Sequence, residues 1–263
     1  MTLRSESSDS TERSGAAAQG EREYYLYGIV PADTPLRKDI LGHDDSPVER
    51  IDHGSVAAVV GPMPQGRALG RRADLMTHSR VVDALAAQGP VIPARFGTVL
   101  PSGAEVVEEL LVPNAEYHTD LLEDLSGKAQ FNLRAQYDEQ AILAEVVAED
   151  AEIAALRERT RRALEDDLYG ERVRLGELVS QALEAKRDVD AQTILDLVAP
   201  HTVEVVTQEG GGLERLLEAS FLVDDAQRQK FESAAEDAAS LMAGRARLRL
   251  LGPLAPYDFV GGV

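Results

Sequence analysis

The sequence predicts an α+β fold in two domains. Short runs rich in aromatic and β-branched residues, ended by Gly or Pro, alternate with helical stretches in the first half of the chain. A long stretch dominated by Ala, Glu, Leu and Arg separates these runs from a second set near the C-terminus. Strands mixed with helices in this order favour antiparallel sheets, each covered by helices. We therefore expect a ferredoxin-like antiparallel sheet with helices on one face, followed by a helical region and a smaller ferredoxin-like β-β-α-β unit.

The first domain is expected at 23–138, after a polar leader at 1–22 whose composition predicts disorder. Its expected elements, in order, are strands at 24–30 and 55–60, a helix at 74–88, a strand at 91–100 bent at its proline, a helix at 103–124 and a strand at 129–137. In the first helix, Leu75, His78, Val82 and Leu85 recur at spacings of three and four, so they share one face.

The second domain is expected at 139–263. It comprises helices at 139–198, a β-β-α-β unit at 201–251 and an apolar tail at 252–263. Gly170 and Gly176 predict a break or kink in the helical region. A heptad-like stripe there indicates packing on the neighbouring sheet or, as the alternative, a coiled coil with a partner; its members are Leu164, Leu168, Glu171, Leu175, Leu178, Ala182 and Ala185.

Composition excludes several classes of function. The chain has no Cys, which excludes disulfides, thiolate metal sites and cysteine nucleophiles. Its 27 basic and 46 acidic side chains give a net charge of -19, which disfavours nucleic acid and anionic membrane surfaces as partners. We find neither a signal peptide nor an apolar stretch of membrane-spanning length, so we expect a cytoplasmic protein.

No catalytic or cofactor signature is present. The sequence has no phosphate-binding loop, dinucleotide fingerprint or nucleophile elbow, and none of its five His lies three or four residues from another. His78 is the one histidine on an apolar helix face. Either it is buried and hydrogen-bonded to the backbone, or it faces a cleft beside Arg95. We expect no enzyme activity and no cofactor.

Three motifs carry a resemblance to a known family. The run Val91–Thr98, which follows His78, resembles the P-x-R-F-G-T signature of the gas vesicle protein F/L family. The end Gly252–Val260 looks like that family's G-P-x-x-P-Y-x-F-V terminus, and Tyr25–Val30 is similar to its first strand. Together the motifs span about 24–260. The motif residues, structural or partner-contacting, are His78, Pro93, Arg95, Phe96, Gly97, Thr98, Gly252, Pro253, Pro256, Tyr257, Phe259 and Val260.

The resemblance implies a non-enzymatic cytoplasmic accessory protein of gas vesicle formation. Its implied partners are the small hydrophobic shell protein and other gas vesicle accessory proteins. It would assist nucleation and assembly while preventing aggregation of the shell protein. Two alternatives are a flavin- or haem-binding protein or enzyme that uses a ferredoxin-like cleft, and a minor structural component of the vesicle.

Two of these motifs have alternative roles. The C-terminal one either packs across the N-terminal domain as a clasp, which its apolar residues favour, or docks a partner. In the P-x-R-F-G-T run the favoured interpretation is structural: Arg95 pairs with a carboxylate across the sheet, Phe96 fills the core, and Gly97 permits a bend. The alternative is a surface that contacts a partner.

Overall fold

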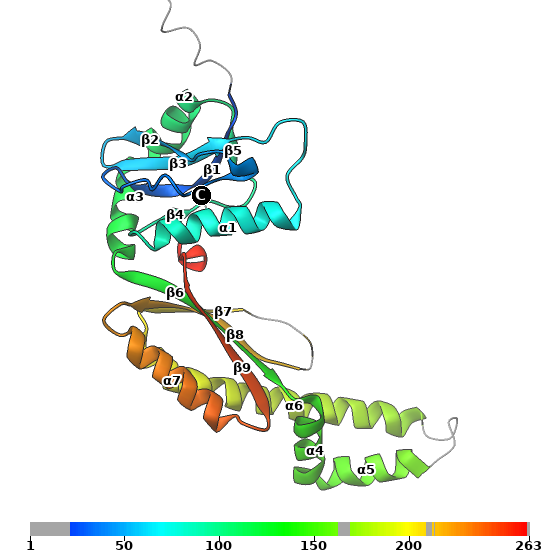
Figure 1. The fold of residues 1–263 in the computed structure, drawn as a ribbon. Helices are drawn as coiled ribbons and strands as arrows, with labels where there is room; N and C mark the ends of the chain where they lie inside the picture. The colour runs from blue at the N-terminus through cyan, green and yellow to red at the C-terminus, as the bar shows by residue number, and fades with distance from the viewer. Residues whose placement is uncertain (1–21, 163–168, 209–211, 213, 262–263) are drawn as a thin grey trace, which may run out of the picture. The chain divides into compact units, whose positions relative to one another are not determined.

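The computed structural model describes residues 22–162, 169–208, 212 and 214–261. The chain forms two compact units, the first ending at Ser126 and the second running from Gly127 to Gly261 (Figure 1). Each unit contains one antiparallel sheet with helices, so the predicted α+β class is confirmed. The leader expected to be disordered lies, apart from Arg22, outside the described residues.

The sheet of the first unit is built around β1 (Tyr24–Pro31). One side of β1 pairs with β3 (Val56–Pro62), which in turn pairs with β2 (Glu49–His53). The other side pairs with two short strands, β4 (Ile92–Pro93) and β5 (Val99–Leu100). The single bent strand expected at 91–100 is thus interrupted, because proline cannot donate to a ladder and Gly97 adopts a positive φ of 92°. Strand β2 was not among the strands expected from the sequence.

Helices cover both faces of this sheet, which corrects the expectation of one covered face (Figure 1). Successive strand residues point to opposite faces. On one face Tyr25 hydrogen-bonds His78 of α1 (Arg72–Ala86). On the other, Tyr24 lies against Gly103, where α2 (Gly103–Glu105) begins. The π-helical η2 (Val106–Leu111) and α3 (Val112–Leu125) continue from α2, so the helix expected at 103–124 is confirmed.

The sheet of the second unit has the strand order β7-β8-β6-β9. Its strands are β6 (Lys128–Tyr137), β7 (Glu204–Thr207), β8 (Arg215–Asp224) and β9 (Ala246–Leu254). The strand expected at 129–137 exists, but it pairs with β8 and β9 and not with the first sheet. The error arises because a strand's own sequence shows its alternation but not its distant partners. The β-β-α-β order of the last elements is confirmed.

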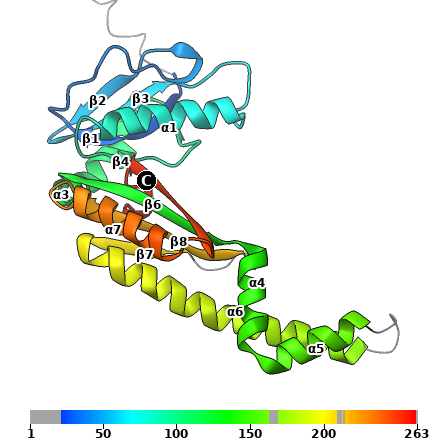
Figure 2. The same ribbon diagram turned by 60° about the horizontal axis from the view of Figure 1, so that its bottom comes forward.

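Helices α6 (Tyr169–Val198) and α7 (Arg228–Leu241) pack on one face of the second sheet (Figure 2). Their shared core includes Phe131, Phe221 and Phe231, with the Phe231 ring centroid 5.3 Å from each of the other two. On the other face, residues 255–260 pass over the sheet and include the short helix η4 (Tyr257–Phe259). The short helices η1 (His43–Asp45) and η3 (Ala199–His201) belong to connections.

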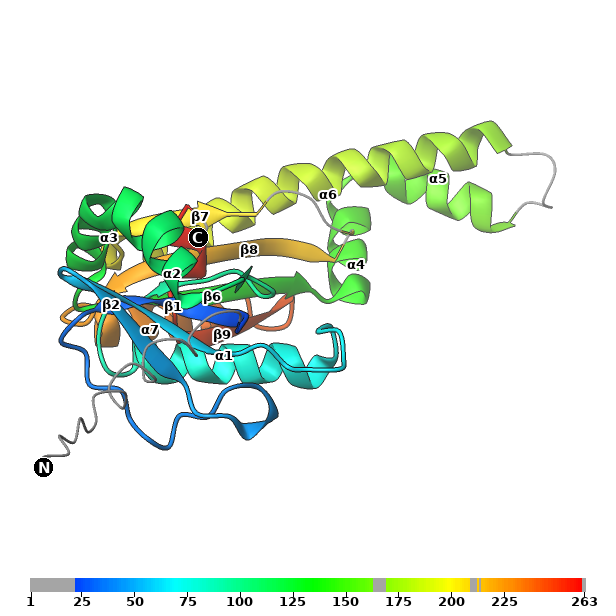
Figure 3. The same cartoon turned by 90° about the horizontal axis from the view of Figure 1, so that it is seen from above.

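The helical region forms an arm. Asp138 caps α4 (Glu139–Glu149) by accepting from the Ala141 N–H, and α5 (Ala151–Arg162) then lies alongside α6 (Figure 3). Gly176 lies inside α6 without a break, so the kink expected there is wrong, whereas Gly170 is the second residue of α6, which begins after α5 has ended at Arg162. A further break, not expected, falls at Asp150 between α4 and α5. In the heptad-like stripe, Leu175, Leu178 and Ala182 pack against the core, Ala185 is exposed, and Leu164 and Leu168 lie outside the described residues.

Candidate functional site

The P-x-R-F-G-T run forms a loop between β4 and β5, and residues 94–98 are called the motif loop below. Both flanking strands pair with β1, and Pro93 lies opposite Gly28. Two further backbone hydrogen bonds tie the loop ends to β1. The Ala94 N–H donates to Tyr27 O at 3.0 Å, and the Leu26 N–H donates to Thr98 O at 3.0 Å. The motif loop is therefore anchored at both ends on the central strand.

A buried chain of hydrogen bonds supports the middle of the motif loop. The Gly97 N–H donates to the Tyr25 hydroxyl at 3.1 Å, and this hydroxyl lies 2.8 Å from His78 Nδ1. His78 Nε2 lies 3.1 Å from Ala94 O. Because a carbonyl oxygen only accepts, Nε2 carries the proton and Nδ1 accepts from the Tyr25 hydroxyl. His78 is thus the buried, backbone-bonded histidine of the first interpretation.

Aromatic rings pack around this chain. The His78 ring centroid lies 5.9 Å from Tyr27 in a stacked arrangement and 5.8 Å from Phe96 in an edge arrangement, and Tyr25 lies 4.5 Å from His43. Burial lowers the pKa of His78 to about 4 and raises the pKa of the Tyr25 phenol to about 12. Both groups stay neutral at neutral pH. Sequence reasoning missed Tyr25, Tyr27 and His43 as supports of this loop, because only their folded positions bring them together.

The tip of the motif loop faces solvent. Phe96 is 37 % exposed, and Arg95 and Gly97 are exposed as well. Arg95 forms no ion pair with any residue that the structure describes. The structural roles favoured from the sequence, a paired Arg95 and a core Phe96, are therefore wrong. The reason is that β4 ends at Pro93, so both side chains lie beyond the sheet that would have buried them.

The closing segment, residues 252–260, begins at the end of β9. Gly252 and Pro253 are exposed there, joined by a cis peptide bond. A Cβ at Gly252 would lie 2.4 Å from Phe131 Cδ1, so the close approach of backbone to ring requires glycine. Further on, Pro256 and Val260 are buried, Phe259 is half-buried, and Tyr257 is 38 % exposed.

Polar contacts fix the closing segment to the second sheet. Asp258 Oδ2 accepts hydrogen bonds from Gln130 Nε2 and Ser220 Oγ, each at 2.6 Å. The Asp258 N–H donates to Gln130 Oε1 at 3.0 Å, so Gln130 binds the segment through both ends of its amide. Gln130 lies on β6, the strand that the sequence assigned to the first domain. Asp258 stands at one of the three variable positions of the family motif and was missed for that reason.

Comparison with known proteins identifies the family. The family model described as gas vesicle synthesis protein GvpL/GvpF matches residues 23–261. The chain belongs to this family. It is 31 % identical to gas vesicle protein F of Streptomyces sp. (strain CB03234), over 90 % of this chain and 98 % of that protein. It is also 26 % identical to gas vesicle protein L of the same organism, over 92 % of this chain and 94 % of the relative.

Solved structures of the GvpL/GvpF family share the fold. The crystal structure of GvpF from Anabaena sp. PCC7120 superposes with a TM-score of 0.79 at 22 % identity, covering 92 % of this chain and 99 % of that one. GvpF from Microcystis aeruginosa gives a TM-score of 0.74 at 22 % identity, covering 90 % and 98 %. This member of the GvpL/GvpF family thus takes part in gas vesicle formation.

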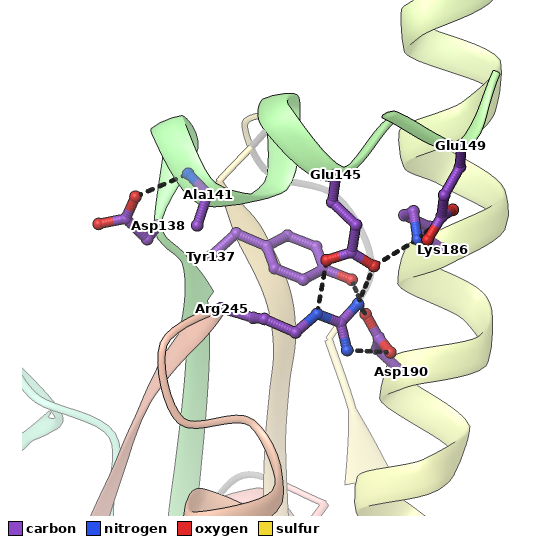
Figure 4. Close-up of polar contacts among 8 residues, drawn as sticks. All are labelled: Tyr137, Asp138, Ala141, Glu145, Glu149, Lys186, Asp190 and Arg245. Atoms are coloured by element: carbon purple, nitrogen blue, oxygen red, sulfur yellow. Dashed lines mark hydrogen bonds and ion pairs between the residues drawn. The ribbon is translucent and has the colours of Figure 1, made fainter. Parts of the chain in front are cut away.

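The second unit of this GvpL/GvpF member also holds a polar cluster that positions the helical arm (Figure 4). Arg245 Nε donates to Glu145 at 2.7 Å and its Nη2 to Asp190 at 2.9 Å, while the Tyr137 hydroxyl donates to Asp190 at 2.6 Å. Lys186 Nζ lies 2.5 Å from Glu145. Burial alone would raise the pKa of Glu145, but hydrogen bonds from Lys186 and Arg245 outweigh it and lower the pKa. The cluster joins α4 and α6 to the sheet.

The described residues contain no group of three or more His, Asp or Glu side chains placed to hold a metal ion. Of the helices that the structure describes, none combines the length and apolar character needed to cross a membrane.

Proposed function

We propose that this chain is a non-enzymatic assembly factor that binds the small hydrophobic gas vesicle shell protein through the motif loop. It keeps the shell protein from aggregating while the vesicle is nucleated. The observation that carries the proposal is the exposure of Arg95 and Phe96 at the tip of a loop that hydrogen bonds at Ala94, Gly97 and Thr98 hold to buried groups.

The construction of the loop suits protein binding. Aromatic and arginine side chains are the residues that most often dominate binding energy at protein interfaces. Because the bonds from Gly97 to Tyr25 and from Ala94 to Tyr27 already fix the backbone, little conformational entropy is lost when a partner docks. Leu75, expected on the buried face of α1, is 50 % exposed one turn before His78. It shares a helix face with His78, whose ring packs against Phe96.

The buried groups beneath the loop support a binding role over a catalytic one. Both ring nitrogens of His78 lie within hydrogen-bond distance of partners, and the pKa values of His78 and Tyr25 lie far from neutrality. A general acid or base works best with a pKa near the operating pH and with access to the substrate. These groups are better suited to holding the loop than to transferring protons.

The net charge of -19 supports the anti-aggregation part of the proposal. A shell protein with exposed apolar surface associates through that surface and through free strand edges. An acidic partner bound to it would cover part of the surface and add repulsion between neighbouring complexes. The protein would act in the cytoplasm, before the shell protein is incorporated into the vesicle.

The test is co-purification of the small shell protein with the full chain and with single variants. Phe96→Ala and Arg95→Ala should each weaken binding about tenfold or more, since both remove contact groups at the tip of the motif loop. Tyr117→Ala removes another exposed aromatic ring from the first unit, and Lys38→Ala another exposed cation. These controls should bind like the unaltered protein. Undiminished binding by both loop variants, with their melting temperatures unchanged, would contradict the proposal.

A further inference from the structure

Strand β9 forms an open edge of the second sheet. It pairs with β6 on one side, and among the described residues no strand pairs with its other side (Figure 1). Every second N–H and C=O group along such an edge points away from the sheet and is free to pair with another chain. Pro253 cannot donate, so the usable stretch runs from Ala246 to Leu251.

One face of this edge is basic. Strand alternation places Arg247 and Arg249 on the face opposite α6 and α7, and the register sets Arg249 beside Arg134. Arg134 and Arg215 share the carboxylate of Glu218. Arg247 and Arg249 are exposed and pair with no carboxylate within the described part of the chain.

The charge of this face is opposite to that of the chain. Arg134, Arg215, Arg247 and Arg249 share this face with two carboxylates, Glu218 and Asp258, so the face is net basic in a protein whose net charge is -19. Unpaired arginines on an exposed strand attract carboxylates and repel other cations, so they select an acidic partner.

The other face of the edge is largely apolar. Leu248 and Leu250 are half-buried and line a groove of about 340 Å³ between β9 and α7. Ala235 and Ala239 of α7 and Leu133 of β6 also line the groove, together with the carboxylate side chains of Glu232 and Glu236. A strand laid along β9 could place small apolar side chains into this groove.

We propose that β9 accepts an extended segment of a partner protein, in which acidic residues alternate with small apolar ones. The segment would add a strand to the sheet, with main-chain hydrogen bonds to Ala246–Leu251. Because strand side chains alternate between faces, its carboxylates would face Arg247 and Arg249 while its apolar side chains enter the groove. This surface lies in the second unit and is independent of the motif loop, so either proposal can fail alone.

The test uses the full chain and two short synthetic peptides, one of alternating valine and glutamate and the other of alternating valine and lysine. NMR titration with the glutamate peptide should shift the amide signals of β9 and slow hydrogen exchange at its outward-facing amides. The lysine peptide should bind at least about tenfold more weakly, because it meets like charges. N-methylation of alternate peptide amides should abolish the binding, since it removes the main-chain pairing.

A charge reversal provides the matched control. Arg247→Glu combined with Arg249→Glu should weaken binding of the glutamate peptide about tenfold and strengthen binding of the lysine peptide. Arg157→Glu combined with Lys230→Glu makes the same change in net charge at other exposed positions of this unit and should change neither affinity. Equal binding of the two peptides, shifts confined to regions other than β9, or no shift at millimolar peptide would overturn the proposal. The last result would show that the arginines protect the edge from any strand.

Discussion

The motif loop and the closing segment are equally prominent in the sequence, but the fold uses them differently. In the motif loop the side chains of Tyr25 and His78 hydrogen-bond the backbone, and Arg95 and Phe96 are left at the surface. In the closing segment the side chain of Asp258 is itself the anchor, bound by Gln130 and Ser220. One motif presents side chains on a fixed backbone, whereas the other uses a side chain to fix its backbone.

This difference separates two reasons why a short motif can mark a family. A loop that presents exposed arginine and aromatic groups is suited to binding, because its side chains are free to contact a partner. A segment whose polar groups are satisfied within its own unit contributes to stability. Substitutions in the two motifs should therefore have opposite signatures, with binding lost in one and stability lost in the other.

Acidification should destabilise the first unit, which carries the motif loop, and this is the largest of the expected effects. Burial lowers the pKa of His78 from 6.5 to about 4, so between these values the unfolded state binds more protons than the folded state. The first unit should therefore lose about 3 kcal/mol of stability as the pH falls from 6.5 to 4. Burial also lowers the pKa of His43, which adds to the loss.

Hydrogen exchange checks this pH dependence within one molecule. Protection of β1 amides should fall across this pH range, and the amides of β6 serve as the internal reference in the second unit. NMR should show the His78 ring neutral down to about pH 5. An imidazole that titrates near 6.5 would contradict the buried hydrogen-bond chain.

A substitution at Gly252, where the closing segment begins, should lower the free energy of unfolding by a similar amount. In Gly252→Ala the new methyl group would lie 2.4 Å from the Phe131 ring, and the overpacking should cost about 2 kcal/mol in urea unfolding. Gly176→Ala is the matched control, because nothing lies within 4 Å of its Cβ position in α6. That variant should gain up to about 1 kcal/mol from higher helix propensity. Equal stability of the two variants would show that Gly252 is not in tight contact.

The sequence predicted the local elements well because their signals are local. Val82 and Leu85, which their spacing placed on one face of the first helix, are both buried, and the β-β-α-β unit expected at 201–251 is found. The strand at Lys128–Tyr137 was also found. Its sheet was not, because pairing with β8 and β9 depends on residues some eighty to one hundred and twenty positions away.

The candidate site was predictable only in part, for the same reason. The motif pointed to Arg95 and Phe96, but their exposure depends on where β4 ends and on a glycine with positive φ. The supports of the loop come from three distant stretches, represented by Tyr25, His43 and His78. A hydrogen bond between residues 53 positions apart leaves no local pattern in the sequence.

The smallest expected effect, and the most direct test of the comparison, is at Asp258. In Asp258→Ala the side chains of Gln130 and Ser220 lose their shared acceptor, and the closing segment should be destabilised by about 1 kcal/mol. Carboxypeptidase should then remove the end of the chain faster, while binding through the motif loop is unchanged. Asp188→Ala removes an exposed carboxylate from α6 and is the control. If Asp258→Ala instead abolished shell-protein binding at unchanged stability, the closing segment would itself be a docking site and the contrast between the two motifs would be wrong.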